Sequence, residues 1–219
     1  MKLHSIKSIL THKEELSVKL LHIDSSILGE HSVSKKLTAD IVSKLSSLHN
    51  NLEVTYRDVA AQPLPHLSGS VLAAASGAIS EPDEQLLAAV NQGNEIMNEF
   101  LAADIVVVGV ALYNFGISSQ LKAWVDRIAV AGKTFRYTEA GPEGLAGNKK
   151  VILAVARGGL YGPDSPAAAF EHAERYMETV FGFVGITDIQ KVIAEGVNMG
   201  AFRDQALLKA SQQISALTV

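Results

Sequence analysis

The chain has 219 residues, of which 47% are hydrophobic and 19% charged, so it can build a buried core and is not a disordered polymer. Its formal net charge is −4, which leaves no basic surplus for nucleic acid or for an anionic membrane surface. The absence of cysteine excludes disulfides, thiolate metal sites, iron–sulfur clusters and a cysteine nucleophile.

The N-terminal region shows no targeting signal. Residues 1–8 lack the apolar stretch of a signal peptide, and the longest apolar run, residues 105–112, is far shorter than the roughly 20 residues of a membrane-spanning helix. We therefore expect a cytoplasmic protein that binds neither membrane nor nucleic acid. Residues 1–17 show no strong pattern and are interpreted as an N-terminal extension.

Five short runs rich in β-forming residues alternate with helical patterns. The expected strands are residues 18–23, 52–57, 105–110, 151–156 and 189–194. The third and fourth are continuously apolar, which is typical of strands covered on both faces in a parallel sheet. Apolar residues spaced by three and four predict helices between and after them, with stripes at Val33-Leu37-Ile41-Leu45-Leu48, Leu86-Val90-Met97-Leu101, Ile117-Leu121-Val125-Ile128, Phe170-Ala173-Met177-Val180-Val184 and Leu207-Ala210-Ile214-Leu217.

This alternation predicts an α/β protein with a doubly wound, five-stranded parallel sheet and helices on both faces. Five strands fit the flavodoxin-like order 2-1-3-4-5 better than a six-stranded dinucleotide-binding fold. We expect a single domain over residues 18–219. The connections 58–82 and 132–149 are too long for ordinary turns, and loops of this length are usually functional lids or disordered.

In such a sheet, ligands bind beyond the carboxyl ends of the strands, which directs attention to the loops after the first, third and fourth strands. Residues 24–34 carry four serines before a helix start, with no Lys or Arg until Lys35. Hydroxyls and free helix N–H groups suit a phosphate monoester. Simple N-capping by serine explains the same residues, so this loop alone leaves both interpretations open.

The other two loops carry aromatic residues and glycines. Tyr113 and Phe115 flank Asn114 after the third strand, an arrangement that suits the face and polar edge of a flat heteroaromatic ligand. The alternative is an asparagine turn with both aromatics in the core. Gly158 and Gly159 follow the fourth strand and either allow a ligand close to the backbone or form a plain turn. All three features fall where the topology places a ligand, and this coincidence favours a binding site.

Several familiar motifs are absent. No G-x-G-x-x-G follows the first strand, and neither H-E-x-x-H nor G-x-S-x-G occurs. Gly132-Lys133-Thr134 is not a phosphate-binding P-loop, because Arg127 occupies the position of the first glycine. Glu171-His172 is expected to be a surface pair. We therefore predict no metal site and no serine-hydrolase chemistry.

Over residues 18 to about 217 the sequence resembles the flavodoxin-like FMN-dependent NADH azoreductases, also described as FMN-dependent NADH:quinone oxidoreductases. The segments that carry the resemblance are Ser25-Ser26-Ile27-Leu28, Tyr113-Asn114-Phe115, Thr134-Phe135-Arg136-Tyr137-Thr138-Glu139, Gly141-Pro142-Glu143-Gly144-Leu145, Arg157-Gly158-Gly159 and Phe183-Val184-Gly185-Ile186-Thr187-Asp188. Their combination is far more specific than any one of them.

The resemblance implies FMN as cofactor, NADH or NADPH as electron donor, and a homodimer whose active sites lie at the subunit interface. It implies phosphate contacts from Ser26, Ser32, Val33 and Ser34. It implies that the isoalloxazine ring is held by Leu112, Tyr113, Asn114, Phe115, Ala156, Arg157, Gly158 and Gly159. Phe135 and Tyr137 are expected in a lid over the substrate slot, and no side chain is expected to be catalytic, because the flavin carries the chemistry.

Three departures from the family pattern stand out. Val33 replaces a usual Gln and can offer only its N–H, Ala156 replaces a usual Ser, and Ala111-Leu112 replaces Pro-Met. These changes put single hydrogen bonds in question rather than flavin binding.

The activity that the resemblance implies is two-electron quinone reduction and reductive azo cleavage by a ping-pong hydride-transfer mechanism. Its substrates would be small aromatic compounds, namely quinones and azo compounds. The main alternative is a flavodoxin-type electron carrier to protein partners, although such carriers are shorter and far more acidic. A non-catalytic flavin sensor is a third hypothesis, for which no residue marks an effector surface.

Overall fold

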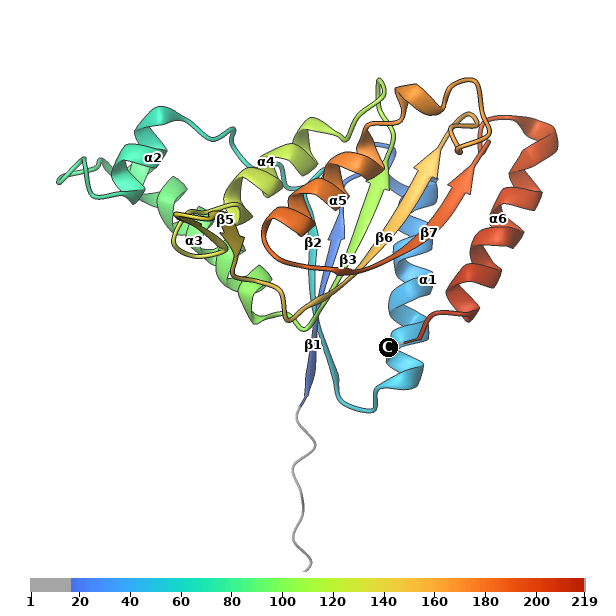
Figure 1. The fold of residues 1–219 in the computed structure, drawn as a ribbon, viewed down its shortest axis with the longest axis horizontal. Helices are drawn as coiled ribbons and strands as arrows, with labels where there is room; N and C mark the ends of the chain where they lie inside the picture. The colour runs from blue at the N-terminus through green and yellow to red at the C-terminus, as the bar shows by residue number, and fades with distance from the viewer. Residues whose placement is uncertain (1–16, 219) are drawn as a thin grey trace, which may run out of the picture.

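The computed structural model describes residues 17–218 and contains a five-stranded parallel sheet between two layers of helices (Figure 1). The strands run in the order β2-β1-β3-β6-β7, and their bounds are β1 (Val18–Asp24), β2 (Leu52–Asp58), β3 (Ile105–Ala111), β6 (Lys150–Arg157) and β7 (Asp188–Glu195). The predicted flavodoxin-like architecture and order are confirmed, because a separate hairpin accounts for the labels β4 and β5. The expected extension, residues 1–17, lies outside the described residues apart from Ser17.

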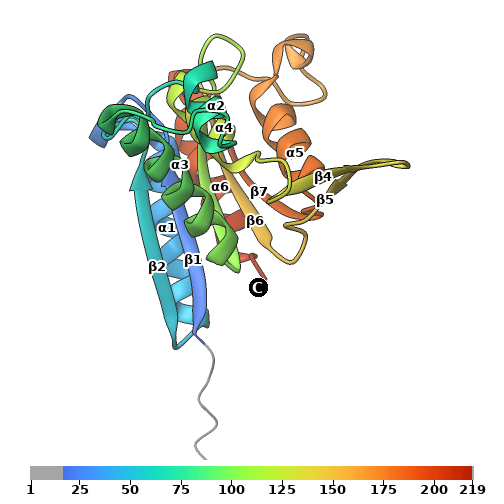
Figure 2. The same cartoon turned by 90° about the vertical axis from the view of Figure 1, so that its left-hand side faces the viewer.

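The helices cover both faces of the sheet (Figure 2). One face is covered by α1 (Val33–Leu48) and α6 (Gly200–Ser215), and the other by α3 (Glu84–Ala102), α4 (Ser119–Ile128) and α5 (Ala173–Phe183). Successive residues of β6 alternate between the two cores: Ile152 packs in the α1–α6 core, whereas Val151 and Leu153 pack in the other. Burial on both faces explains why the central strands are apolar throughout.

The two long connections contain secondary structure. Residues 58–82 include the short helix α2 (Gly69–Ala75), and residues 132–149 fold as an antiparallel hairpin of β4 (Phe135–Thr138) and β5 (Gly141–Gly144). Both connections are therefore ordered, and their interpretation as lids stays a prediction. A Cβ atom at Gly144 would overlap the backbone of Gly185, so the hairpin is fixed by a close backbone contact that has no signature in sequence periodicity.

Two helical stripes extend beyond the helices that form. Ile117 precedes α4 because Ser118 caps this helix, accepting a hydrogen bond from the Leu121 N–H at 3.2 Å. Phe170 precedes α5 and ends the 3₁₀ turn η2 (Ala168–Phe170). Its side chain is half exposed instead of lying on the buried face of α5.

Candidate functional site

The carboxyl ends of β1, β3 and β6 bring the three predicted loops together. Ser26 Oγ, after β1, lies 3.0 Å from the hydroxyl of Tyr113, after β3. The Leu112 N–H donates to the Ala156 carbonyl at 3.0 Å, which joins the ends of β3 and β6. Ser118 Oγ, at the start of α4, donates to the Ser25 carbonyl at 3.0 Å. Sequence reasoning therefore identified segments that are neighbours in space.

The first of these loops places buried polar groups at the N-terminus of α1. After the 3₁₀ turn η1 (Gly29–His31), Ser32 caps α1 by accepting from the Lys35 N–H at 3.1 Å, and Ser34 Oγ lies 3.2 Å from Ser32 Oγ. Both serines and Ser26 are buried. Val33 packs its side chain against the α1–α6 core, so it adds only its N–H to the polar groups at the start of α1. First-turn N–H groups have no acceptor within the helix, and together with the hydroxyls they suit an anion.

A buried carboxylate, absent from the sequence prediction, holds this end of α1 against the sheet. Asp24 accepts hydrogen bonds from Thr38 Oγ1 at 2.7 Å and from the Tyr56 hydroxyl at 2.9 Å, and His22 Nε2 lies 3.4 Å away. Burial and the hydrogen bond to Asp24 raise the pKa of Tyr56 to about 12. Asp24 thus links the second turn of α1 to β1 and β2, and this fixes the position of the serines at the start of α1.

The loop after β3 is a tight two-residue turn. Tyr113 and Gly116 exchange backbone hydrogen bonds of 2.8 and 2.9 Å, and the two residues between them have positive φ angles, 45° at Asn114 and 71° at Phe115. A bulky residue in this region is strained by roughly 1–3 kcal/mol and is found chiefly where function demands it. Phe115 is 50% exposed, so the alternative that both aromatics are buried in the core is wrong for this residue.

Phe115 has an aromatic neighbour that the sequence analysis assigned to a helix. Its ring centroid lies 5.5 Å from that of Phe170, and the rings are tilted by 45°. The His172 N–H donates to the Phe115 carbonyl at 3.0 Å, which ties the loop after β3 to the start of α5. The two half-exposed rings together form an apolar surface at the carboxyl edge of the sheet.

The Arg-Gly-Gly segment differs from the prediction at its first residue. Arg157 is the last residue of β6 and not a loop residue, and its side chain is 4% exposed and paired with Glu174. Gly158 makes a close contact that sequence reasoning missed: a Cβ atom there would lie 2.7 Å from Asn198 Nδ2, so the Asn198 side chain would have to shift. The Asn198 N–H also donates to the Gly158 carbonyl at 3.1 Å. The loop after β7 therefore packs directly against Gly158 through Asn198.

Glu171 was expected at the surface and is instead buried, with 5% of its surface exposed. Its carboxylate accepts from the Glu174 N–H at 2.8 Å and faces Arg157 at 3.9 Å. His172 is exposed, as expected. The buried cation at the end of β6 explains the difference, because a carboxylate enters a protein interior when a partner charge and N–H donors await it there.

Phe135 and Tyr137 do not join the other predicted residues within one chain. Phe135, the first residue of β4, is buried, with its ring centroid 4.6 Å from that of Phe183. Tyr137 is 74% exposed on the hairpin, which projects sideways from the body (Figure 2).

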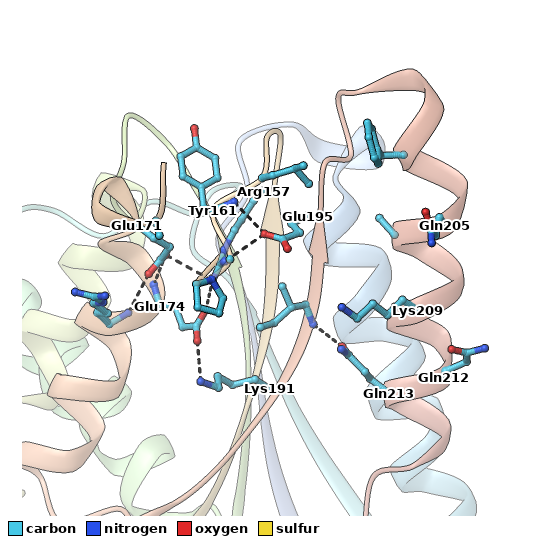
Figure 3. Close-up of a pocket in the computed structure, with 18 of the residues that line it drawn as sticks. Arg157, Tyr161, Glu171, Glu174, Lys191, Glu195, Gln205, Lys209, Gln212 and Gln213 are labelled. Carbon is cyan, nitrogen blue, oxygen red and sulfur yellow. Dashed lines mark hydrogen bonds and ion pairs between the residues drawn. The ribbon is translucent and has the colours of Figure 1, made fainter. Parts of the chain in front are cut away.

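A groove of about 870 Å³ runs between α5, β7 and α6, beside the Arg157 side chain (Figure 3). Its lining includes Leu160, Tyr161 and Gly162 of the loop after β6, but no residue of the loops after β1 and β3. Across residues 17–218, no set of three acidic or histidine side chains is arranged to bind a metal ion. No helix in this part of the chain has the length and hydropathy needed to span a membrane.

Comparison with known proteins defines the class to which this fold and site belong. A family described as having the flavodoxin-like fold matches residues 18–217, so the chain belongs to the flavodoxin-like family. An FMN-dependent NADH:quinone oxidoreductase of Methylorubrum extorquens is 57% identical over 202 residues, covering 91% of this chain and 98% of that protein.

Solved structures are similar over the same range. The azoreductase of Bacillus anthracis strain Sterne superimposes with a TM-score of 0.80 at 33% identity and covers 90% of this chain and 95% of its own. An FMN-dependent NADH-azoreductase of Bacillus anthracis strain Ames Ancestor, solved in complex with FMN, has a TM-score of 0.80 at 26% identity, covering 91% of this chain and 98% of its own.

Proposed function

We propose that this protein is an FMN-dependent NAD(P)H oxidoreductase that reduces quinones by two electrons and reductively cleaves aromatic azo compounds by a ping-pong mechanism. One observation carries the proposal: three loops meet at one edge of a flavodoxin-like sheet. They are the loop with Ser26, Ser32 and Ser34, the Tyr113–Gly116 turn and the Gly158–Gly159 segment. The 57% identity to an FMN-dependent NADH:quinone oxidoreductase supports it. We further propose a single FMN-binding domain over residues 18–219 and a cytoplasmic location, to which the lack of cysteine is suited.

The residues fit a flavin mononucleotide. Ser32, Val33 and Ser34 lie at the positive end of the α1 dipole, and their two hydroxyls and the Val33 N–H, together with the hydroxyl of the buried Ser26, would bind the phosphate. Val33 contributes no side-chain donor, so the phosphate relies on hydroxyls and backbone N–H groups. Bound FMN would supply the hydride chemistry, accepting from the nicotinamide and donating to the substrate.

The chain's own task is to position the flavin and to exclude water. Leu112 and Ala156, joined by a backbone hydrogen bond, form the floor of the ring site, with Gly158 and Gly159 on one side. Asn114 is exposed at the tip of the turn, where its amide can both donate to and accept from the polar edge of the ring. Phe115 presents an apolar face against which a quinone or azo compound can stack. A flat apolar slot of this kind discriminates weakly among aromatic substrates.

A homodimer would complete the slot. The hairpin projects from the body with Tyr137 74% exposed, and Phe135 packs against Phe183. We propose that this hairpin covers the slot of a second copy, with Tyr137 as the covering side chain and Phe135 as its support. Neither nucleic acid nor a membrane enters the proposal.

Steady-state kinetics with NADH and menadione test the function, with FMN added and no partner protein. We expect NADH oxidation with parallel double-reciprocal plots, because NADH gives up its hydride and leaves as NAD⁺ before the quinone binds. Phe115→Ala should reduce kcat/KM for menadione about tenfold through loss of the stacking surface. Leu208→Ala, an exposed apolar side chain on α6, is the matched control and should leave kcat/KM unchanged. NADH oxidation that requires an added reductase would support the electron-carrier alternative instead.

A further inference from the structure

Arg157 lies at the centre of a buried charge cluster behind the Gly158–Gly159 segment (Figure 3). Its guanidinium pairs with Glu174 on α5, lies 3.9 Å from Glu171 at the start of α5, and lies 3.7 Å from Glu195 at the end of β7. The side chains of Arg157 and Glu171 are 4% and 6% exposed. The Arg157 guanidinium therefore links the end of β6 to the start of α5 and to the end of β7.

Glu171 and Glu195 each also accept a hydrogen bond from a backbone N–H group. Glu195 accepts from the Tyr161 N–H at 3.0 Å, and Tyr161 belongs to the loop that continues from Gly158 and Gly159. Glu171 accepts from the Glu174 N–H at 2.8 Å and so fixes the first turn of α5. A displacement of either carboxylate would be passed to the main chain around the flavin site.

The cluster reaches the aromatic surface through residues next to Glu171. Phe170 immediately precedes it and packs on Phe115, with ring centroids 5.5 Å apart. His172 immediately follows it and donates its N–H to the Phe115 carbonyl at 3.0 Å. The position of Glu171 thus sets the position of both rings.

The charges make Arg157 difficult to replace. Three carboxylates surround one guanidinium, and Lys191 reaches Glu174 and Glu178 from the solvent side, at 2.7 and 2.8 Å. Glu171 and Glu195 lie within 4 Å of Arg157. Removing the guanidinium would leave like charges close together, one of them buried, and they would move apart or move toward solvent.

We propose that Arg157 is a positioning residue of the quinone-reduction site. Its side chain is buried among carboxylates, and it sets the geometry of the Phe115–Phe170 surface through Glu171 and that of the Gly158–Tyr161 loop through Glu195. This inference rests on the proposed function. The Arg-Gly-Gly segment thus has two roles: the Arg157 side chain faces the groove between α5 and α6, and the two glycines face the proposed flavin site.

The test uses full-length protein with saturating FMN and NADH and a series of menadione concentrations, and records the KM for menadione, kcat and the thermal unfolding midpoint. Arg157→Gln should raise the KM for menadione about tenfold and lower the midpoint. Arg157→Lys keeps a cation and should recover most of the midpoint. It should not recover KM, because one ammonium cannot span three carboxylates as the guanidinium fork does. A purely structural role predicts that KM and the midpoint recover together, and that result would overturn the inference.

Lys191→Gln is the matched control, because it removes a cation from the same cluster without touching Glu171 or Glu195; its KM should equal that of the wild type. An equal rise in KM for this variant would assign the effect to total charge and overturn the inference. If Arg157→Gln does not fold, Glu171→Gln decides, with KM expected to rise and an unchanged KM contradicting the inference. An inactive wild type would refute the proposed function itself, whereas an active wild type with insensitive variants refutes only the role of Arg157.

Discussion

Asn114 and Phe115 occupy a backbone region that costs energy for any residue with a Cβ atom, and for an aromatic side chain most of all. The sequence predicted a turn with aromatic residues at the sheet edge, and that much is confirmed. The positive φ angles could not be predicted, because a two-residue turn of this kind normally carries glycine at its second central position. The chain places Phe115 there instead, which agrees with a side chain retained for contact with a ligand.

Substitution at Phe115 should therefore reverse the usual order of glycine and alanine. Phe115→Gly should have a free energy of unfolding about 1 kcal/mol higher than Phe115→Ala, because alanine bears the left-handed penalty and glycine does not. Urea unfolding followed by the fluorescence of the single tryptophan measures both. Phe202, exposed in helix α6, supplies the control: there the alanine variant should be the more stable. The same order at both positions would argue against strain at Phe115.

At the scale of elements, the strands were predictable and the contacts between elements were not. The expected runs 105–110 and 151–156 differ from β3 and β6 by no more than one residue at either end, because coverage on both faces leaves an uninterrupted apolar signal. The hairpin β4–β5 was missed because its packing depends on the backbone contact between Gly144 and Gly185. Asn198 and Glu171 were missed because their partners are fixed only when the loops meet.

The link between β2 and α1 should confer a pH-dependent stability. Asp58 pairs with Lys35 at 2.9 Å and accepts from the N–H groups of Ala61 and Ala60. Burial alone would raise the pKa of Asp58, but these hydrogen bonds outweigh it and hold the pKa below its usual value of 3.8. A carboxyl with a lowered pKa in the folded state stabilises the protein above its usual pKa, and this contribution is lost as the pH falls through the lowered value.

Asp58→Asn should therefore lower the free energy of unfolding by about 2 kcal/mol at neutral pH. The gap between variant and wild type should narrow as the pH drops below about 4. Urea titrations at a series of pH values measure this gap. Asp40→Asn, which removes an exposed pair with Lys36 on α1, should show little change at any pH. A gap for Asp58→Asn that stays constant into the acid range would contradict the assignment.

For the whole molecule, topology was the most informative prediction, because a parallel sheet with this strand order specifies the edge where ligands bind. The residues of the three loops followed from that rule and from the family resemblance. The charge cluster around Arg157 could not be predicted, since Arg157 ends β6, Glu171 and Glu174 lie at the start of α5 and Glu195 ends β7, and their burial depends on the complete fold. Sequence patterns and the family resemblance predicted the residues that we propose to face the ligand, and the structure was needed to find the residues that contact them.

The most direct measurement is the visible spectrum of protein that has been supplemented with FMN and desalted, recorded before and after anaerobic addition of NADH and then of menadione. Our account predicts that flavin absorbance is retained, is bleached by NADH and returns with the quinone. Loss of flavin on desalting would contradict the proposed FMN site, which consists of Ser26, Ser32 and Ser34 and of the loops after β3 and β6. Retained flavin that NADH cannot bleach would contradict the oxidoreductase function.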